Sequence, residues 1–99
     1  MVNFELRYAL RQPQAKGDKF QDRYQACLDQ CQWADALGFS SVMLSEHHGS
    51  PDGYMSSPMV VGGAIAGITK RMRIRIVSLV GPLHNPVRLA EDLATLDIL

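Results

Sequence analysis

Glu46, His47 and His48 are the side chains best suited to chemistry in this sequence, and they are consecutive. They open the stretch EHHGSPDGYMSS, which lies between a short apolar run and a glycine-rich apolar segment. A histidine near a carboxylate can act as a general acid or base, because its unperturbed pKa is about 6.5. The alternative is that these histidines only form hydrogen bonds within a loop, which is the more common role of such residues.

A metal site would be another use of two histidines. Neighbouring side chains in an extended chain point to opposite sides, so His47 and His48 are not expected to face one ion together. By the same argument, Glu46 lies on the face opposite to His47. Histidine pairs that bind zinc from a helix are instead four residues apart. We therefore predict no metal ligands, and we expect one histidine to face a site while the other packs away from it.

Three other features lead to no catalytic prediction. Cys27 and Cys31 have the spacing of one helix face, not that of a redox CxxC pair or a zinc site, so we expect two buried, reduced thiols. The glycines of GGAIAG would lie within a helix, where close packing explains them better than a dinucleotide site does. Ser45 lacks the GxSxG pattern of a hydrolase nucleophile.

The spacing of apolar residues alternates between the period of a strand and that of a helix. Strands are predicted at residues 2–9, 39–45 and 73–81, and helices at residues 18–37, 58–68 and 86–99. Asp18, Ser57 and Asn85 are the predicted N-caps, and Gly38 is predicted to end the first helix. Residues 46–57 form a loop that is longer than most connections between a strand and a helix.

This order of elements predicts an α/β fold made of three consecutive βα units with parallel strands. An open doubly wound sheet and the first part of a (β/α)8 barrel both have that order. A barrel needs about 250 residues, and this chain has 99. Because the sequence stops at Leu99 within an apolar helix, we expect a single truncated domain. Its open sheet edges predict self-association or marginal stability.

The predicted topology places the candidate residues at one edge of the sheet. In parallel α/β folds, functional loops follow the carboxyl ends of the strands. The loop after residues 39–45 begins with Glu46, and the loop after residues 73–81 contains His84. Glu46, His47, His48 and His84 are therefore expected to converge.

The composition restricts the partners that we expect. The formal net charge is zero, 46% of the residues are hydrophobic and 20% are charged, which gives no reason to expect a nucleic acid or an anionic membrane as partner. No apolar run approaches the roughly 20 residues of a membrane span. The charged, alternating N-terminus is unlike a secretory signal. We therefore expect a cytoplasmic protein.

Three ordered segments of the sequence resemble one known family. WADALGFSSVMLSEHHG, SSPMVVGGAIAGITKRMRI and PLHNPVRLAEDLATLDIL resemble the amino-terminal part of the bacterial luciferase-like monooxygenases. These are (β/α)8-barrel enzymes that depend on a flavin or a deazaflavin. The resemblance implies a full-length enzyme that oxidises a small organic substrate with O2 at reduced FMN, supplied in two-component members by a separate flavin reductase. It also implies that most of the barrel lies outside these residues, so the chain alone is expected to be inactive.

Two alternatives to this function stay open. One remains within the family and replaces the oxygen chemistry by hydride transfer with the deazaflavin F420. The other is a catalytically inert half-barrel that associates with further copies of itself through its open strand edges.

The resemblance also implies roles for four residues. His47 matches the first histidine of the family's EHH motif, which sits beside the flavin and can act as an acid or base. Glu46 matches a position whose backbone approaches the flavin. Val77 and Ser78 match a pair under the flavin ring that often carries a non-prolyl cis peptide bond. We therefore expect His47 to be catalytic, and Glu46, Val77 and Ser78 to bind the cofactor.

Arg75 departs from the family pattern, which often has glycine or another small residue there. Strict alternation puts Arg75 on the same side of its strand as Val77, so it would enter the lower part of the barrel interior. A cation in that place needs a partner, and Glu5 on the first strand is the candidate. Lys70 and Arg71 belong to the opposite, amino-terminal edge, where we expect a solvated surface.

Overall fold

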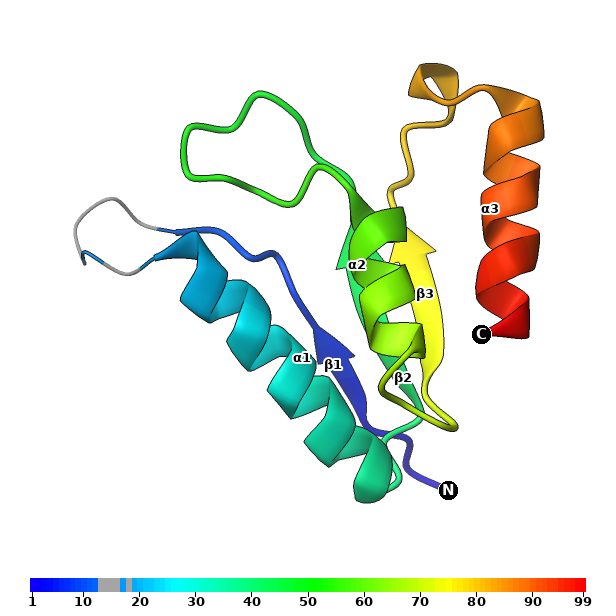
Figure 1. Ribbon diagram of the computed structural model, residues 1–99. Helices are drawn as coiled ribbons and strands as arrows, with labels where there is room; N and C mark the ends of the chain where they lie inside the picture. The colour runs from blue at the N-terminus through cyan, green and yellow to red at the C-terminus, as the bar shows by residue number, and fades with distance from the viewer. Residues whose placement is uncertain (13–16, 18) are drawn as a thin grey trace.

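The computed structural model describes residues 1–12, 17 and 19–99. Three parallel strands form one sheet in the order β1-β2-β3, and each strand is followed by a helix (Figure 1). The strands are β1 (Glu5–Arg7), β2 (Ser41–Ser45) and β3 (Arg73–Val77), and the helices are α1 (Phe20–Ala36), α2 (Pro58–Ala66) and α3 (Pro86–Ile98). The predicted α/β fold with three consecutive βα units and parallel strands is therefore confirmed. Across the described residues, no helix is long and apolar enough to cross a membrane.

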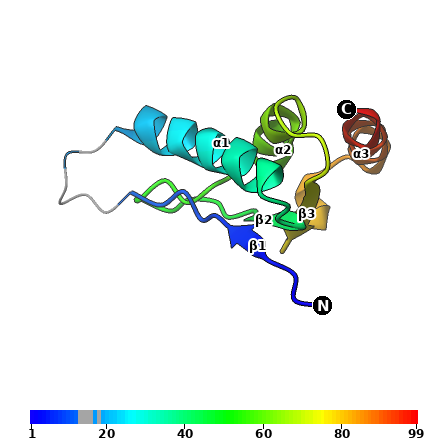
Figure 2. The same ribbon diagram turned by 90° about the horizontal axis from the view of Figure 1, so that it is seen from below.

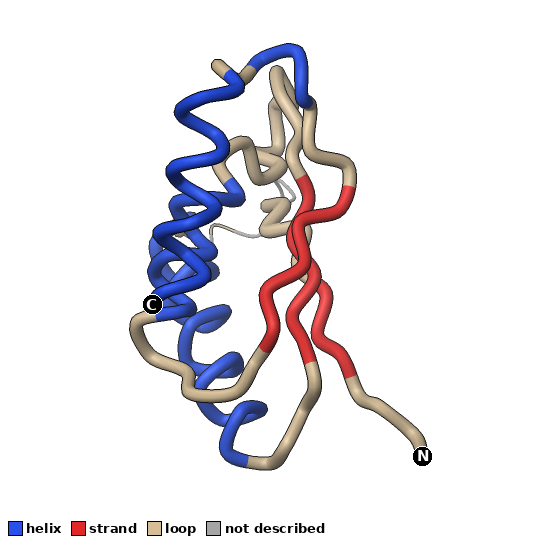
Figure 3. Tube along the Cα trace, turned by 90° about the vertical axis from the view of Figure 1, so that its right-hand side faces the viewer, coloured by secondary structure: helices blue, strands red, loops and turns tan. Residues whose placement is uncertain are grey.

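All three helices lie on the same side of the sheet, as Figures 2 and 3 show from two directions. A doubly wound sheet carries helices on both faces, whereas a barrel carries them only on its outside. The sequential strand order agrees with a barrel as well. The arrangement thus favours the first part of a (β/α)8 barrel over a doubly wound sheet.

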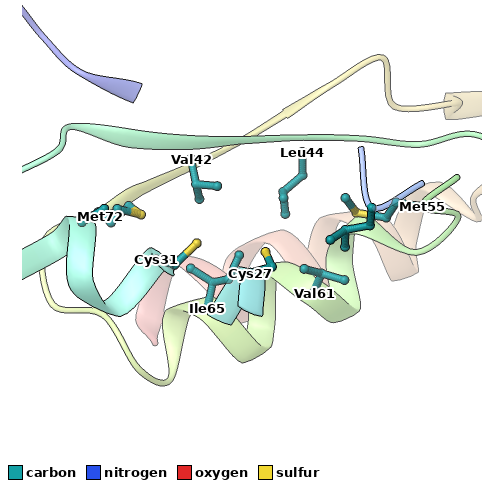
Figure 4. Packing of buried hydrophobic residues seen from close by; sticks show 10 residues of the cluster. Cys27, Cys31, Val42, Leu44, Met55, Val61, Ile65 and Met72 are labelled. Atoms are coloured by element: carbon teal, nitrogen blue, oxygen red, sulfur yellow. The ribbon is translucent and has the colours of Figure 1, made fainter. Parts of the chain in front are cut away.

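The register of the sheet separates an apolar face from a charged one. Leu6, Val42 and Ile74 are aligned across the three strands. Figure 4 shows Val42 and Leu44 pointing from β2 toward the helices, so this face forms the core. Residues at the alternate positions then face away from the helices. On that face the aligned residues are Glu5, Ser41 and Arg73, followed by Arg7, Met43 and Arg75.

The core lies between β2 and the helices α1 and α2 (Figure 4). Its buried members come from several elements: Leu10 after β1, Cys27, Cys31 and Ala34 of α1, Val42 and Leu44 of β2, Met55 of the following loop, Val61 and Ile65 of α2, and Met72 before β3. Both cysteines are free and buried, as their spacing predicted. Gly62 is also buried, and a Cβ there would lie 3.5 Å from Cγ2 of Ile74. This is an ordinary van der Waals distance, so the packing of α2 on β3 has room for a Cβ and does not by itself require glycine here.

The strands are shorter than predicted. β1 and β2 begin later than residues 2 and 39, because their ladder pairs only Glu5–Arg7 with residues 41–43. β3 ends at Val77 instead of residue 81, since Ser78 leaves the extended conformation with a φ of +63°. A 3₁₀ turn, Gly81–Leu83, follows. The helices also end one or two residues earlier than predicted.

The predicted helix caps have different outcomes. The side chain of Asn85 accepts hydrogen bonds from the backbone N–H groups of Val87 and Arg88, so it caps α3 as predicted. Gly38 follows α1 with a φ of +86°, the left-handed conformation that glycine adopts most readily. Ser57 is the N-cap of α2, but its side chain makes no capping hydrogen bond. Asp18 lies outside the described residues.

A buried carboxylate organises the amino-terminal edge of the sheet. Asp35 accepts hydrogen bonds from the backbone N–H of Lys70 at 2.8 Å and of Arg71 at 3.0 Å. These bonds, led by that from Lys70, hold the pKa of Asp35 below its ordinary value. Nη2 of Arg71 also donates to the Asp35 carbonyl at 3.2 Å. The side chains of Lys70 and Arg71 are exposed as expected, but their backbone anchors the end of α1 to the start of β3.

Candidate functional site

The loops that follow β2 and β3 lie at the same end of the sheet (Figure 1). Glu46 is the first residue of the loop after β2, and His84 lies in the loop after β3. Nε2 of His84 is 2.9 Å from Oε2 of Glu46, and Nε2 of His48 is 2.7 Å from Oε1. Parallel topology therefore brings together three of the four residues that were expected to converge.

Glu46 is a buried carboxylate with its acceptor positions occupied. Its side chain is 1% exposed. Besides the two histidines, the backbone N–H of Val80 donates to Oε2 at 2.7 Å. Burial by itself would raise the pKa of Glu46, but the hydrogen bonds from His84, His48 and Val80 outweigh that effect and hold the pKa at about 2. The site therefore has a fixed negative charge at its centre.

The backbone after β3 aims Val80 at this carboxylate. Ser78 adopts a φ of +63°, which is uncommon for a residue other than glycine, and strained residues of this kind cluster at functional sites. The described residues contain no cis peptide bond, so Val77 and Ser78 lack the cis bond that the matching pair often carries in the family. The chain instead leaves β3 through the left-handed conformation of Ser78. Val77 itself is still paired in the sheet, opposite Ser45.

His47 does not join the Glu46 cluster. Its backbone N–H donates to the carbonyl of Met55 at 2.8 Å. Its ring packs against the ring of Tyr54, with centroids 3.8 Å apart and planes tilted by 54°. Among the described residues, no hydrogen bond joins the His47 ring to Glu46 or to either of the other histidines. The two adjacent histidines thus have different environments, as the alternation of side chains predicted.

Contacts with the segment after β1 position Tyr54 and the rest of this loop. Nε of Arg11 donates to the carboxylate of Asp52 at 2.6 Å, and the Arg11 guanidinium lies 5.0 Å from the centre of the Tyr54 ring. The Ser50 hydroxyl and Arg11 together lower the pKa of Asp52. The backbone N–H of Gln12 also donates to the Asp52 carbonyl at 2.7 Å. Two loops that are distant in sequence thereby hold the ring on which His47 packs.

Arg75 pairs with Glu5, as alternation along the strands predicted. Nη1 of Arg75 lies 2.6 Å from Oε2 of Glu5 on the face of the sheet away from the helices. The Ser41 hydroxyl donates to the same oxygen at 2.7 Å. Ser41 first, and then Arg75, lower the pKa of Glu5. The contribution of Ser41 was missed in the sequence, although it is the β2 residue that pairs with Glu5.

The structure brings His48 to Glu46 as expected, and their spacing of two residues permits this because residues i and i+2 share a side in extended chain. Two further residues, Val80 and Tyr54, were not selected by sequence reasoning. Val80 takes part through its backbone, for which side-chain identity carries no signal. Tyr54 belongs to no recognisable motif, so the sequence did not single it out. Among the described residues, no group of three His, Cys, Asp or Glu side chains is arranged to hold a metal ion.

A sequence profile of the luciferase-like monooxygenases matches residues 4–99, which is nearly the whole chain. The chain belongs to the luciferase-like monooxygenase family. The resemblance carried by its three ordered segments is thereby confirmed. Among relatives of this luciferase-like chain, the alkanal monooxygenase beta chain of Photorhabdus luminescens is 34% identical over 66 residues. That alignment covers 67% of this chain and 20% of the relative.

Solved structures agree with the luciferase-like fold. The monooxygenase RslO1 from Streptomyces bottropensis gives a TM-score of 0.84 at 28% identity, over 97% of this chain and 29% of that chain. The oxygenating constituent of 3,6-diketocamphane monooxygenase from Pseudomonas putida, solved in complex with FMN, gives a TM-score of 0.81. Its identity is 21%, over 97% of this chain and 26% of that chain, so the likeness is one of fold. The luciferase-like chain therefore spans about a fifth of the curated relative and less than a third of each solved chain.

Proposed function

We propose that this chain forms the amino-terminal part of a flavin-dependent monooxygenase that oxidises a small organic substrate with O2. The proposal rests on the residues at the carboxyl-terminal edge of the sheet in this luciferase-like chain. There, the left-handed Ser78 and the half-buried imidazole of His47 follow neighbouring strands. Reduced FMN, when bound, supplies the electrons with which oxygen is activated.

The groups at this edge suit a flavin ring, which needs flat apolar contact together with a few polar groups. Val77 is a half-buried apolar residue, and Ser78 is an exposed residue with a hydroxyl group. The side chain of Glu46 is occupied by His48, His84 and Val80, so only its backbone remains for a cofactor. We therefore assign Val77, Ser78 and the backbone of Glu46 to the flavin pocket.

His47 is the proposed acid–base group. Its ring is restrained on one side by Tyr54, and its backbone is held by Met55, so the imidazole keeps a defined orientation. A restrained imidazole can take a proton from a bound substrate or return it without first reorganising. Tyr54 is in turn held by Arg11, which places the orientation of His47 under the control of the loop after β1.

The activity belongs to a more complete barrel. β1 and β3 are the outer strands of the described sheet, so each has one edge with unpaired backbone groups. Further strands would cover these edges and supply the remaining walls of the pocket. We expect the chain by itself to be inactive, and a separate flavin reductase to serve the complete enzyme.

Two alternatives make different predictions. Hydride transfer with F420 uses the same edge of the sheet and differs in the cofactor that binds. An inert half-barrel would use the open edge of β3, beside which lies a groove of about 730 Å³ between β3 and α3. Apolar residues in this groove include Ile74, Ile76, Leu79, Leu93 and Leu96. A second copy seated there would bury this apolar surface.

Cofactor titration separates these possibilities. The purified chain is titrated without oxygen with reduced FMN and, separately, with F420, while absorbance, fluorescence and far-ultraviolet circular dichroism are recorded. Saturable binding of FMN with a shifted spectrum supports the proposal. Binding of F420 alone would support hydride transfer. A folded, associated chain that binds neither would refute the idea that these residues alone hold the cofactor, as the inert half-barrel predicts. His47→Ala should weaken the spectral shift more than the matched control His48→Ala.

A further inference from the structure

Two imidazole rings turn the same nitrogen toward one carboxylate. Nε2 of His48 lies 2.7 Å from Oε1 of Glu46. Nε2 of His84 lies 2.9 Å from Oε2 and 3.1 Å from Oε1 of the same group. His48 follows β2 and His84 follows β3, so Glu46 links the two loops through both rings.

The protonation of these rings follows from what a carboxylate can do. An ionised carboxylate only accepts hydrogen bonds, and a neutral imidazole carries one proton, on either Nδ1 or Nε2. A hydrogen bond from each ring to Glu46 therefore requires the proton on Nε2. Nδ1 is then the nitrogen that keeps its lone pair. Among the described residues, Nδ1 of His48 and Nδ1 of His84 have no hydrogen-bond partner.

The surroundings keep this arrangement fixed. The Glu46 side chain is 1% exposed, so water cannot readily replace either ring. The Val80 N–H donates to Oε2 and restrains rotation of the carboxylate. Hydrogen bonds in such a shielded place are stronger than the same bonds in water. Glu46 thus keeps one orientation and stays ionised.

We propose that Glu46 is a positioning residue that holds His48 and His84 as Nε2–H tautomers, so that Nδ1 of His84 is a second proton-accepting nitrogen of the site. His84 is favoured over His48 because its side chain is 27% exposed, against 46% for His48. Solvent therefore competes less for its bond to Glu46. His84 also lies in the same loop as Ser78, which the proposed function assigns to the flavin pocket.

The proton transfer is balanced by the residues present. When Nδ1 of His84 accepts a proton, the bond between that proton and the bound organic substrate breaks, and its electron pair stays on the substrate. The ring becomes an imidazolium, and Glu46, which remains ionised, stabilises its charge. The proton transfer to His84 rests on the proposed function. The assignment of the Nε2–H tautomers does not depend on it.

Nitrogen NMR of the histidine rings tests the tautomers. Long-range correlation of ring protons with ¹⁵N distinguishes a protonated ring nitrogen from one with a lone pair. In the wild-type chain, at a pH at which the rings are neutral, we expect one tautomer for His48 and His84, with the Nε2 proton of His84 visible because its exchange with water is slow. His47, which has no carboxylate partner among the described residues, provides the internal comparison. A detectable Nδ1–H form of His84 would overturn the proposal.

A variant tests whether Glu46 causes this preference. In Glu46→Gln an NH2 group that donates replaces one of the two accepting oxygens, so the ring facing that NH2 must accept through Nε2. We therefore expect the Nδ1–H form to appear in at least one of His48 and His84, and the Nε2 proton of His84 to exchange faster. Glu91→Gln removes an exposed carboxylate on α3 and should leave the rings unchanged. Unchanged tautomers in a folded Glu46→Gln chain would refute the positioning role. If that variant does not fold, the tautomer and the proton exchange of His84 in the wild-type chain decide.

Failure of this inference and failure of the proposed function give different results. The NMR experiment contains no flavin, so the tautomers can be as expected in a chain that binds no FMN. That outcome would leave the role of Glu46 intact and would count against flavin binding by these residues alone. FMN binding together with a mixture of His84 tautomers would support the proposed function and refute the positioning role of Glu46.

Discussion

Replacing Glu46 by alanine removes a negative charge that joins the loop after β2 to the loop after β3. The N–H of the half-buried Val80 would lose its partner, which costs about 1–3 kcal/mol. The charge-assisted bond from His84 contributes a similar amount, and that from the more exposed His48 contributes about 0.5 kcal/mol. With partial relaxation of the two loops, we expect a loss of about 3 kcal/mol in the free energy of unfolding. For a domain of this size that lowers Tm by roughly 12–24 °C.

Glu46→Gln is the more conservative change, because its amide oxygen can still accept the hydrogen bonds made to one of the two carboxylate oxygens. We expect it to lower the free energy of unfolding by about 1–2 kcal/mol at pH 7. Glu91→Gln serves as the matched control, since the Glu91 side chain is 63% exposed and lies 3.6 Å from Arg88. That control should change stability by less than about 0.5 kcal/mol. Urea unfolding followed by circular dichroism measures the free energy of unfolding of the wild-type chain and of each variant.

The pH dependence identifies the charge as the cause. The pKa of Glu46 is about 2 in the folded chain, below its ordinary value of 4.5. Its contribution is therefore fully present above pH 4.5 and is lost as the pH falls toward 2. His48 and His84 are the titratable groups that face Glu46, and Asp35, Asp52 and Glu5 are unchanged in every chain compared. The difference between wild type and Glu46→Gln should thus shrink across that window. Equal stability at pH 7, or a difference that stays constant down to pH 2.5, would refute the reasoning.

Three further predictions concern the core and the opposite edge of the sheet. Leu44→Ala should cost about 3 kcal/mol in urea unfolding, because Leu44 is fully buried, whereas Leu83→Ala at an exposed position should change little; equal effects would contradict the packing. Asp35→Asn should lower the unfolding free energy by about 1–2 kcal/mol, since the amide oxygen replaces only one of two acceptors; an unchanged urea midpoint would argue against that anchor. Cys27 and Cys31 should react with a thiol reagent far more slowly in the native chain than in urea, and rapid native labelling would contradict their burial.

The sequence predicted features that depend on one element or on the alternation of side chains along a strand. The change between periods of two and 3.6 residues is local, so the order of strands and helices could be predicted. Asn85 caps α3 through groups within three residues of itself. Arg75 and Glu5 are far apart in sequence, but the alternation of side chains along parallel strands was enough to pair them.

The strand ends were predicted less well, because a strand lasts only as long as its neighbour pairs with it. Val77 pairs with Ser45, which is the last residue of β2, and the predicted extension of β3 beyond it has no partner there. The left-handed turn at Ser78 carries no strong local signal, since serine seldom adopts it.

The sequence by itself determined the family, the order of three βα units and the edge of the sheet at which Glu46 and the histidines gather. Only the tertiary structure decided which of them meet. His84 lies 38 residues after Glu46, and it reaches the carboxylate because two parallel strands end side by side. His47 follows Glu46 directly, yet it packs against Tyr54, because neighbouring side chains leave an extended chain on opposite sides. The chemistry of this edge therefore depends on contacts between loops, which spacing along the chain does not specify.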